Sequence, residues 1–338
     1  MTIEHNAPLQ SLNTFGVAAT TKYFTRITEL SDLQNLFNNP IYPKTPKLIL
    51  GGGSNVLFTQ NFEGILLYNA IKGIEMVKET EDHVWVKAYG GENWHEFVTY
   101  CVNQNWSGIE NLSLIPGSVG AAPLQNIGAY GVELKDVFSE LEAFDLKTGE
   151  IRRFTAEECQ FDYRDSVFKR DLKDCYFVFS VTLKLHKTPQ YKLDYGVIRQ
   201  QLEAMEITEL SIKAVSDAIC MIRQEKLPNP KKIGNAGSFF KNPIVYLPFF
   251  EKLLNQYPSM PYYQIDAHSI KIPAGWLIEQ CGWKGKKVGQ TGSYKNQALV
   301  LVNYGNATGK EIAALAKNIK CSVKSKFNID LEQEINMI

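Results

Sequence analysis

Residues 111–132 read Asn-Leu-Ser-Leu-Ile-Pro-Gly-Ser-Val-Gly-Ala-Ala-Pro-Leu-Gln-Asn-Ile-Gly-Ala-Tyr-Gly-Val, a run of 22 residues without one charged side chain. Its glycines permit backbone angles and close approaches that a Cβ atom would forbid, and Pro116 and Pro123 stiffen the turns. Such a segment can direct backbone N–H groups at a diphosphate or a flat ring without Lys or Arg, because oriented amides form an anion-binding concavity. The alternative is an ordinary buried Gly/Ala-rich loop, whose backbone polar groups need protein partners.

A second glycine-rich segment follows a short apolar strand at residues 47–50. It reads Gly51-Gly-Gly-Ser-Asn55 and leads into the apolar run 56–58. A Rossmann fingerprint needs GxGxxG at the start of a helix, but Val56 stands where the last glycine of that pattern belongs. The order strand, glycine turn, strand therefore excludes a Rossmann loop and predicts a phosphate cradle of backbone N–H groups, with Ser54 and Asn55 as added donors. The alternative is a tight hairpin that binds nothing.

Composition limits the classes of function. The chain has 338 residues, which predicts two or three domains, and its 36 basic and 36 acidic residues cancel. A neutral chain argues against nucleic acid or an acidic membrane as the main partner. No apolar run approaches a membrane span, and the N-terminus lacks the features of a signal peptide. The six cysteines form no CxxC pair, so we expect buried free thiols and no metal site.

Hydrophobic periodicity predicts an α+β chain rather than a regular βαβ repeat. We expect a short helix capped by Ser31 or Asp32, a capping box at Thr155–Glu158, and an irregular segment at residues 1–20. We place a domain boundary near Thr208, after the segment 191–202. The strands are expected at 22–27, 47–50, 84–89, 138–146, 150–154, 176–185, 297–302 and 329–338, and the longer helices at 92–104, 211–223, 248–257, 274–281 and 308–327.

Six motifs occur in one order along nearly the whole chain. They are Gly51-Gly-Gly-Ser-Asn55, Ile115-Pro-Gly-Ser-Val-Gly-Ala121, Gln125-Asn-Ile-Gly-Ala-Tyr-Gly131, Tyr163-Arg-Asp-Ser-Val-Phe168, Gly234-Asn-Ala-Gly-Ser-Phe-Phe-Lys-Asn-Pro243 and Leu331-Glu-Gln-Glu334. In this combination the chain resembles the UDP-N-acetylenolpyruvoylglucosamine reductases, the flavoenzymes of peptidoglycan precursor synthesis. Tyr195 and the long segment 244–290 resemble the longer subtype of that family, in which a tyrosine loop folds over the substrate.

The resemblance implies a fold of the α+β class. A two-part FAD-binding unit of the vanillyl-alcohol-oxidase (PCMH) type would comprise residues 1–70 and 71–207. A C-terminal α+β substrate-binding domain would comprise residues 208–338, with the final strand returning to the active site. The resemblance also implies a cytoplasmic enzyme, expected as a monomer without nucleic-acid or membrane partners.

The same resemblance implies the reaction and its residues. NADPH reduces bound FAD, and the flavin passes a hydride to C3 of UDP-N-acetylglucosamine enolpyruvate, giving UDP-N-acetylmuramate. Arg164 and Glu334 match the residues that stabilise the intermediate, and Ser238 matches the donor of a proton to C2. The substrate contacts implied are Tyr195, Lys226, Asn242 and Gln297. The cofactor contacts implied are Gly51, Gly52, Gly53, Ser54, Asn55, Pro116, Gly117, Ser118, Gly120, Ala121, Gln125, Asn126, Gly128, Tyr130 and Gly131.

These residue types fit the chemistry. Hydride attack at C3 pushes charge into C2 and its carboxylate, and the enolate needs donors aimed at the carboxylate oxygens. A guanidinium at Arg164 can hold a planar carboxylate with two parallel donors. Glu334 assists only when it is protonated or when it orients a water or Arg164, so we expect a raised pKa for its carboxyl. Ser238 is a weak acid, yet the enolate of a carboxylate is a strong base.

Each of the three residues also has an ordinary structural interpretation. Arg164 would form a surface ion pair with Asp162 or Asp165, Ser238 would be a turn residue, and Glu334 would be an exposed strand charge. Their joint match to the family favours the catalytic interpretation. Two alternatives stay open at the level of function: a different FAD oxidoreductase on the same fold, and a non-catalytic nucleotide-sugar binding protein. Neither glycine-rich segment contains His or Cys, so the FAD is expected to be noncovalent.

Overall fold

The computed structural model describes residues 1–194 and 196–338, and these form two compact units. The first unit comprises Met1–Ala7, Thr20–Gly53 and Phe62–Gln224. The second unit comprises Pro8–Ala19, Ser54–Asn61 and Glu225–Ile338. Unlike the three expected parts, this division assigns residues 208–224 to the first unit and residues 8–19 and 54–61 to the second. The division into three domains stays a prediction.

The first unit contains a four-stranded sheet with the order β1-β2-β5-β3. Its strands are β1 (Ile3–Pro8), β2 (Thr20–Ile27), β3 (Lys47–Leu50) and β5 (Phe62–Asn69), and β5 pairs in parallel with both β2 and β3. Helix α1 (Leu30–Phe37) connects β2 to β3, and its capping box joins Glu29 to Asp32. The expected cap at Ser31 or Asp32 is therefore wrong, because Asp32 occupies the third helical position. The N-terminal segment expected to be irregular contributes β1.

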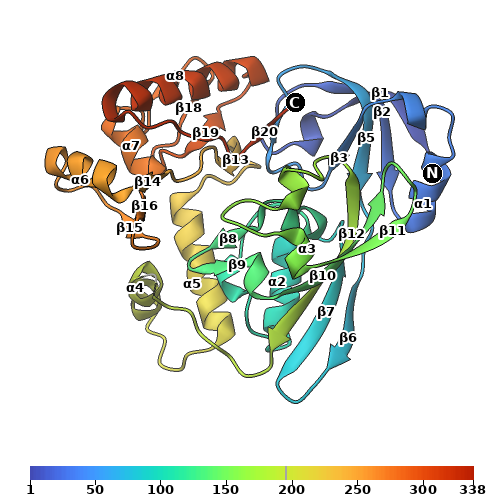
Figure 1. Cartoon of the computed structure of the whole chain (residues 1–338), viewed down its shortest axis with the longest axis horizontal. Coiled ribbons are helices and arrows are strands. Elements are labelled where there is room, and N and C mark those ends of the chain that lie inside the picture. Colours follow the sequence, from blue (N-terminus) through green and yellow to red (C-terminus); the bar gives the residue numbers. More distant parts are fainter. Residues whose placement is uncertain (195) are drawn as a thin grey trace. The chain divides into compact units, whose positions relative to one another are not determined.

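A five-stranded antiparallel sheet of the same unit has the order β11-β10-β12-β7-β6 (Figure 1). Its strands are β6 (Ile74–Glu79), β7 (His83–Tyr89), β10 (Phe138–Asp145), β11 (Ile151–Thr155) and β12 (Tyr176–His186). The expected hairpin of β10 and β11 is confirmed, as is the capping box of Thr155 and Glu158 that starts α3 (Ala156–Cys159). Helix α2 (Trp94–Asn103) buries its predicted apolar face against this sheet.

A β-bulge lets strand β12 serve two hydrophobic cores. The register changes from Glu142↔Ser180 to Ala143↔Val178, so Phe179 is the extra residue. On one face, Val178 and the later apolar residues of β12 pack with α2. On the other face, Phe179 packs with residues of the four-stranded sheet and of α1. The bulge thus allows one strand to join the two sheets of this unit.

The remainder of the first unit consists of short turns and two helices. Between α2 and β10 lie β8 (Gly128–Ala129), β9 (Val132–Glu133) and a series of single 3₁₀ turns. Helix α5 (Ile212–Lys226) packs against α4 (Gly196–Ala204) through a separate apolar cluster. The expected helix at 211–223 is confirmed, with its end three residues later.

The second unit combines small antiparallel sheets with three helices. One sheet has the order β13-β19-β18-β17 and another the order β14-β16-β15. The strands are β13 (Gly234–Ser238), β14 (Ile244–Tyr246), β15 (Tyr263–Gln264), β16 (Ser269–Lys271), β17 (Lys287–Val288), β18 (Thr291–Ser293) and β19 (Val300–Asn303), and the helices are α6 (Leu247–Gln256), α7 (Ala274–Gln280) and α8 (Gly309–Phe327). The three helices expected here are confirmed, whereas the strand expected at 297–302 begins only at Val300.

The end of the chain contains less strand than expected. Only β20 (Asn336–Met337) is a strand, and it pairs in parallel with β4 (Val56–Leu57). Because β3 pairs with β5 and β4 pairs with β20, the two strands that flank the glycine turn do not form a hairpin. The hairpin alternative for this turn is wrong.

All six cysteines are free, of which Cys101 and Cys159 are buried and Cys321 is exposed. The expectation of buried thiols therefore holds for some of the six only. Within residues 1–194 and 196–338, no helix is long and apolar enough to cross a membrane.

A partly buried ion pair on the five-stranded sheet gives a prediction for stability. Lys87 Nζ lies 2.5 Å from Glu142 Oε2, with side chains 20% and 18% exposed, and Ser180 Oγ donates to the same oxygen at 2.8 Å. Burial raises the pKa of Glu142, but the hydrogen bonds from Lys87 and Ser180 and the charge of Lys87 outweigh burial and lower it. We expect Glu142→Gln to reduce the free energy of unfolding at pH 7 by about 1–3 kcal/mol.

The pH dependence follows from the direction of that shift. A depressed carboxyl pKa stabilises the fold above the unfolded value of about 4.3, and the contribution is lost as the pH falls through the folded pKa. Urea unfolding should therefore show wild type and Glu142→Gln converging toward pH 3. The matched control is Glu79→Gln, which removes a more exposed pair with Lys187 and should cost less than about 0.5 kcal/mol. An equal difference at pH 3 and pH 7 would contradict the assignment.

Candidate active site

Two glycine-rich loops of the first unit meet at Gly52 and Gly117. A Cβ atom at Gly52 would lie 2.8 Å from Cα of Gly117, and one at Gly51 would collide with the hydroxyl of Ser118. Only glycine fits at these two positions, because the second loop passes directly over the first. The structure thus brings together segments that lie more than sixty residues apart in the sequence and that were predicted to bind phosphate.

The backbone of the second loop is partly used inside the protein. The N–H groups of Val119 and Gly120 donate to the carbonyls of Glu92 and Gly90, each at 2.9 Å. In contrast, the part of the chain that the structure describes offers no acceptor to the N–H groups of Gly51, Gly52, Gly117 and Ser118. These four N–H groups therefore remain available to the predicted concavity, whereas those of Val119 and Gly120 do not. Any contact that Gly120 makes with a cofactor must use another atom than its amide nitrogen.

Two buried polar atoms beside this concavity lack partners among the described residues, Ser118 Oγ and Asn69 Oδ1. Asn69 Nδ2 donates to the carbonyl of Val178 at 2.8 Å, and a Cβ at Gly120 would lie 3.0 Å from the same nitrogen. An unsatisfied buried polar atom costs about 1–3 kcal/mol, so its presence indicates a ligand. Phosphate oxygens of FAD would accept from the four amides and from Ser118 Oγ, and the residues present therefore fit the cofactor.

The second half of the long loop is fixed by Asn126 and Tyr130, both with positive φ. Asn126 Nδ2 donates to Glu133 Oε2 and to the carbonyl of Asp162, each at 3.0 Å, and its Oδ1 accepts from the N–H of Lys135. The whole side-chain amide of Asn126 is thus engaged within the protein. Its predicted contact with the cofactor stays a prediction and would have to come from the backbone.

Arg164 adopts a backbone conformation that is unusual for an arginine, with a φ of 53°. Its Nη2 donates to the carbonyl of Gly128 at 2.5 Å, and a Cβ at Gly128 would lie 2.8 Å from Nη1. The left-handed region costs a non-glycine residue roughly 1–2 kcal/mol, and such strain is typical of functional sites. Asp165, one of the two acids considered as a surface partner of Arg164, pairs with Arg170.

In the second unit, Ser238 and Glu334 lie on neighbouring backbone segments. Ser238 ends β13 after Gly237, which has a φ of 72°. The N–H of Glu334 donates to the carbonyl of Phe239 at 2.9 Å, and Asn55 Nδ2 donates to the carbonyl of Glu334 at 3.2 Å. The structure therefore brings two of the three predicted catalytic residues together, and it gives the side chain of Asn55 a role in holding the C-terminal segment.

The predicted substrate residues are spread more widely. Asn242 Oδ1 accepts from the N–H of Ala274, the first residue of α7, at 2.9 Å. Gln297 Oε1 accepts from the N–H of Leu299 at 3.3 Å and lies beside Gly275. These two residues thus meet at the beginning of α7. Lys226 is exposed at the end of α5, and Tyr195 lies outside the described residues.

The sequence analysis missed Arg223. This residue stands on α5, four residues after Ile219 and eight after Val215, and therefore on the apolar face of the helix. Its Nε donates to the carbonyl of Leu114 at 3.2 Å, directly before the motif that begins at Ile115. The sequence offered one signal for Arg223, namely a charged residue at a position where the helical spacing predicts an apolar one.

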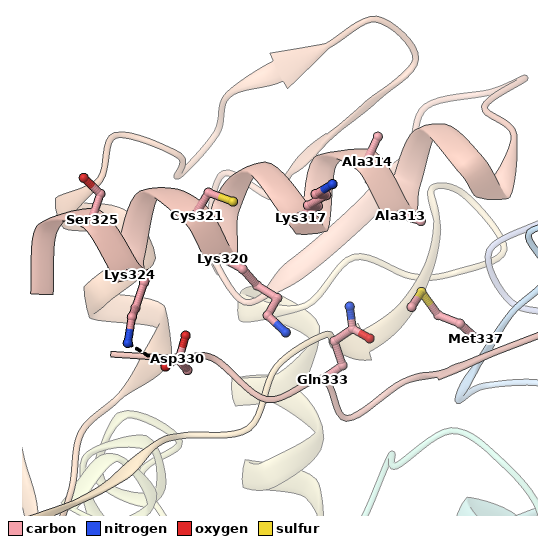
Figure 2. A pocket seen from close by; sticks show the side chains of 10 residues that line it. All are labelled: Ala313, Ala314, Lys317, Lys320, Cys321, Lys324, Ser325, Asp330, Gln333 and Met337. Carbon is pink, nitrogen blue, oxygen red and sulfur yellow. Dashed lines mark hydrogen bonds and ion pairs between the residues drawn. The ribbon is translucent and has the colours of Figure 1, made fainter. Parts of the chain in front are cut away.

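A hollow of about 750 Å³ lies along α8, and Gln333 lines it but the neighbouring Glu334 does not (Figure 2). Lys317, Lys320 and Lys324 line it together with small apolar side chains, and Lys324 pairs with Asp330 at 2.7 Å. Neither Ser238 nor Glu334 belongs to its lining. This hollow is therefore not the candidate active site.

Known proteins match the chain over its whole length. Residues 229–338 match the model of the UDP-N-acetylenolpyruvoylglucosamine reductase C-terminal domain, and residues 22–155 match that of the FAD binding domain. The UDP-N-acetylenolpyruvoylglucosamine reductase of Amoebophilus asiaticus is 50% identical over 338 residues, covering 100% of both chains. That of Flavobacterium johnsoniae is 45% identical over 339 residues, again covering 100% of both. The chain belongs to the UDP-N-acetylenolpyruvoylglucosamine reductase family.

A solved structure supports the fold. The crystal structure of the UDP-N-acetylenolpyruvylglucosamine reductase from Thermus caldophilus aligns with a TM-score of 0.68 and 22% identity, covering 100% of this chain and 99% of the other. The expected family and fold class are thus confirmed, and the chain is an oxidoreductase with an FAD-binding domain. In a member of this family, the close contact of the two glycine loops and the unbonded Ser118 Oγ of the first unit are the features to test as a cofactor site.

The contact at Gly51 gives a direct test of the cofactor site. Gly51→Ala would force the Ser118 hydroxyl out of its place, whereas Gly196→Ala adds a Cβ with no atom within 4 Å. We expect Gly51→Ala to weaken FAD binding at least tenfold, measured by quenching of flavin fluorescence on titration of the apoprotein. The Gly196→Ala control should bind like wild type. If Gly51→Ala bound FAD as tightly as the control, the two loops would not form the cofactor site.

Proposed function

We propose that the chain catalyses the NADPH-dependent reduction of UDP-N-acetylglucosamine enolpyruvate to UDP-N-acetylmuramate through noncovalent FAD, as a cytoplasmic step of peptidoglycan synthesis. The observation that carries the proposal is the conformation of Arg164. Its strained backbone and its bond to Gly128 hold a guanidinium on the glycine-rich loop, in a chain similar to these reductases from end to end. A non-catalytic binding protein would have no use for that strain.

Arg164 binds the carboxylate of the enol ether in this proposal. FAD, when bound, supplies the hydride that C3 accepts. The guanidinium of Arg164 then faces the charge that develops on the carboxylate oxygens, where two parallel donors stabilise it. Because the arginine is fixed before the substrate arrives, little reorganisation is needed when that charge appears.

Ser238 Oγ donates the proton that C2 takes up, and Glu334 assists. The N–H of Glu334 donates to the carbonyl of Phe239, the residue that follows Ser238, and this proximity supports their joint action. A serine alkoxide must be reprotonated quickly, and Lys226 or a water held by Glu334 is the source in this proposal. In this proposal Glu334 acts either as a protonated acid, which requires a pKa above the ordinary range, or by orienting that water or Arg164.

Four residues would recognise the nucleotide sugar. Lys226 offers a point charge to the diphosphate, and Tyr195 stacks and hydrogen-bonds. Asn242 and Gln297 supply amides, which their shared position at the start of α7 supports. The enzyme would act as a monomer, with no nucleic-acid or membrane partner, in keeping with equal numbers of acidic and basic residues.

The spectrum of the purified protein tests this function. Under anaerobic conditions NADPH should bleach the flavin bands, and the enol ether should restore them. Bleaching without recovery would keep a flavoenzyme but require another oxidant. A protein that bound no flavin, even with FAD added, would refute the proposal.

The mode of flavin attachment follows from the composition of the two loops. Residues 51–58 and 111–132 contain neither His nor Cys, the residue types through which flavin could be attached covalently there. Acid precipitation should therefore release all the yellow colour into the supernatant. Flavin that stayed with the precipitate would show a covalent bond.

Ser238→Ala isolates the proton donor. Loss of a general acid typically costs 10²- to 10⁴-fold, so we expect kcat to fall by that factor while the rate of flavin bleaching by NADPH stays unchanged. Stopped-flow absorbance separates the two half-reactions. Ser325→Ala, at an exposed position of α8, serves as the control. Full turnover by Ser238→Ala would assign the proton to another group.

A further inference from the structure

Residues on one face of α5 contact α2 and the start of the glycine-rich loop of residues 111–132. Ser216, Cys220 and Arg223 stand at positions i, i+4 and i+7, so they share a face. Ser216 Oγ lies 2.7 Å from Ser113 Oγ, and Cys220 Sγ lies 4.0 Å from His95 Nε2. Arg223 extends this row by one turn, which brings its guanidinium to the start of the loop.

Arg223, the last residue of this row, bonds to Leu114 of the loop. The φ of Leu114 is 57°, a left-handed value that is rare for leucine. Its N–H donates to His95 Nδ1 at 3.0 Å, and its carbonyl accepts from Arg223 Nε at 3.2 Å. Both polar groups of Leu114 are thus held by side chains, which keeps the strained residue in place. The bond to Leu114 uses only one of the five N–H groups of Arg223.

The charge of Arg223 has no acidic partner among residues 1–194 and 196–338. Its recorded partners are the carbonyl of Leu114 and the hydroxyl of Tyr130, both neutral. The Arg223 side chain is half-buried, and burial lowers the pKa of its guanidinium. An arginine keeps its charge there, and a buried charge without a counterion is expensive.

Arg164 adds a second positive charge nearby. Its field also depresses the pKa of Arg223, and the loop that Arg164 contacts at Gly128 continues to Tyr130, which bonds Arg223. An anion that reached both guanidiniums across this short loop would offset their mutual repulsion. No anion of the described chain fulfils this role for Arg223.

We propose that Arg223 binds an oxyanion jointly with Arg164, as a second substrate-binding cation that the sequence motifs do not reveal. The inference rests on the proposed function and names the carboxylate of the enol ether as the oxyanion, because Arg164 holds that group in the proposed reaction. The pyrimidine end of FAD carries similar oxygen chemistry, and the experiment separates the two sources. Nε of Arg223 serves Leu114, while the terminal amino groups serve the anion.

The experiment compares Arg223→Gln with a matched control, Arg199→Gln, whose guanidinium is exposed on α4 at 4.0 Å from Asp194. Oxidised holoenzyme is titrated with the enol ether, and binding is followed by the change in the flavin spectrum. FAD affinity of the apoprotein and the flavin midpoint potential are measured on the same variants. Removing one partner of a buried charge pair should raise the Kd of the enol ether about 30- to 1000-fold, with Arg199→Gln unchanged.

The source of the anion is read from the other two measurements. Unchanged FAD affinity and midpoint potential with weakened substrate binding assign the carboxylate. A weakened FAD affinity and a shifted potential, with substrate binding intact, assign the flavin oxygens and keep the two-cation site. Arg223→Gln that matches Arg199→Gln in all three measurements overturns the proposal.

Two further variants separate anion binding from a merely structural role. Arg223→Lys keeps the charge and should recover part of the substrate affinity if Arg223→Gln is poorly folded. His95→Phe removes the other bond to Leu114 but leaves Arg223 in place. If His95→Phe reproduced the losses of Arg223→Gln, the effect would come from the loop alone and the proposal would fall. A wild-type spectrum that the enol ether leaves unchanged would instead refute the proposed function itself.

Discussion

The burial of an uncharged, irregular loop is the constraint on which the first unit depends. Irregular backbone offers its polar groups no ladder or helix, so other elements must supply the partners. The carbonyls of Gly90 and Glu92 accept from this loop, Asn111 donates to the carbonyl of Tyr130, and Trp94 Nε1 donates to the carbonyl of Leu112. The strand–turn–helix unit β7–α2 is thus as much a source of hydrogen bonds as a packing surface.

Close approach makes the same loop a candidate binding site. Glycine at positions 51, 52, 117 and 120 lets two loops and the end of β7 lie nearly in contact. That proximity leaves a few amides and one hydroxyl without partners in the described chain. These open groups are candidates for contacts with a ligand, since each unsatisfied buried group is costly.

Strain is concentrated in the same region. Leu114, Asn126, Tyr130 and Arg164 all have positive φ without being glycine. Each conformation costs energy and persists only where neighbours fix it, as His95 and Arg223 do for Leu114. In the reaction proposed here, negative charge develops on a small carboxylate, and a cation fixed in advance stabilises that charge better than a mobile one. The strained loop would provide such fixation.

Sequence alone determined the family, the order of most elements and the candidate catalytic residues, because these depend on local periodicity, capping and motif order. Helix α8 and the hairpin of β10 and β11 follow from spacing within one segment. Tertiary structure decided which groups become partners. A hairpin was one alternative for the glycine turn, but β4 pairs with a strand from the other end of the chain. Arg223 is an ordinary helical arginine in the sequence, and only the fold shows its bond to Leu114. Such pairings depend on contacts between distant residues, and no local pattern encodes them.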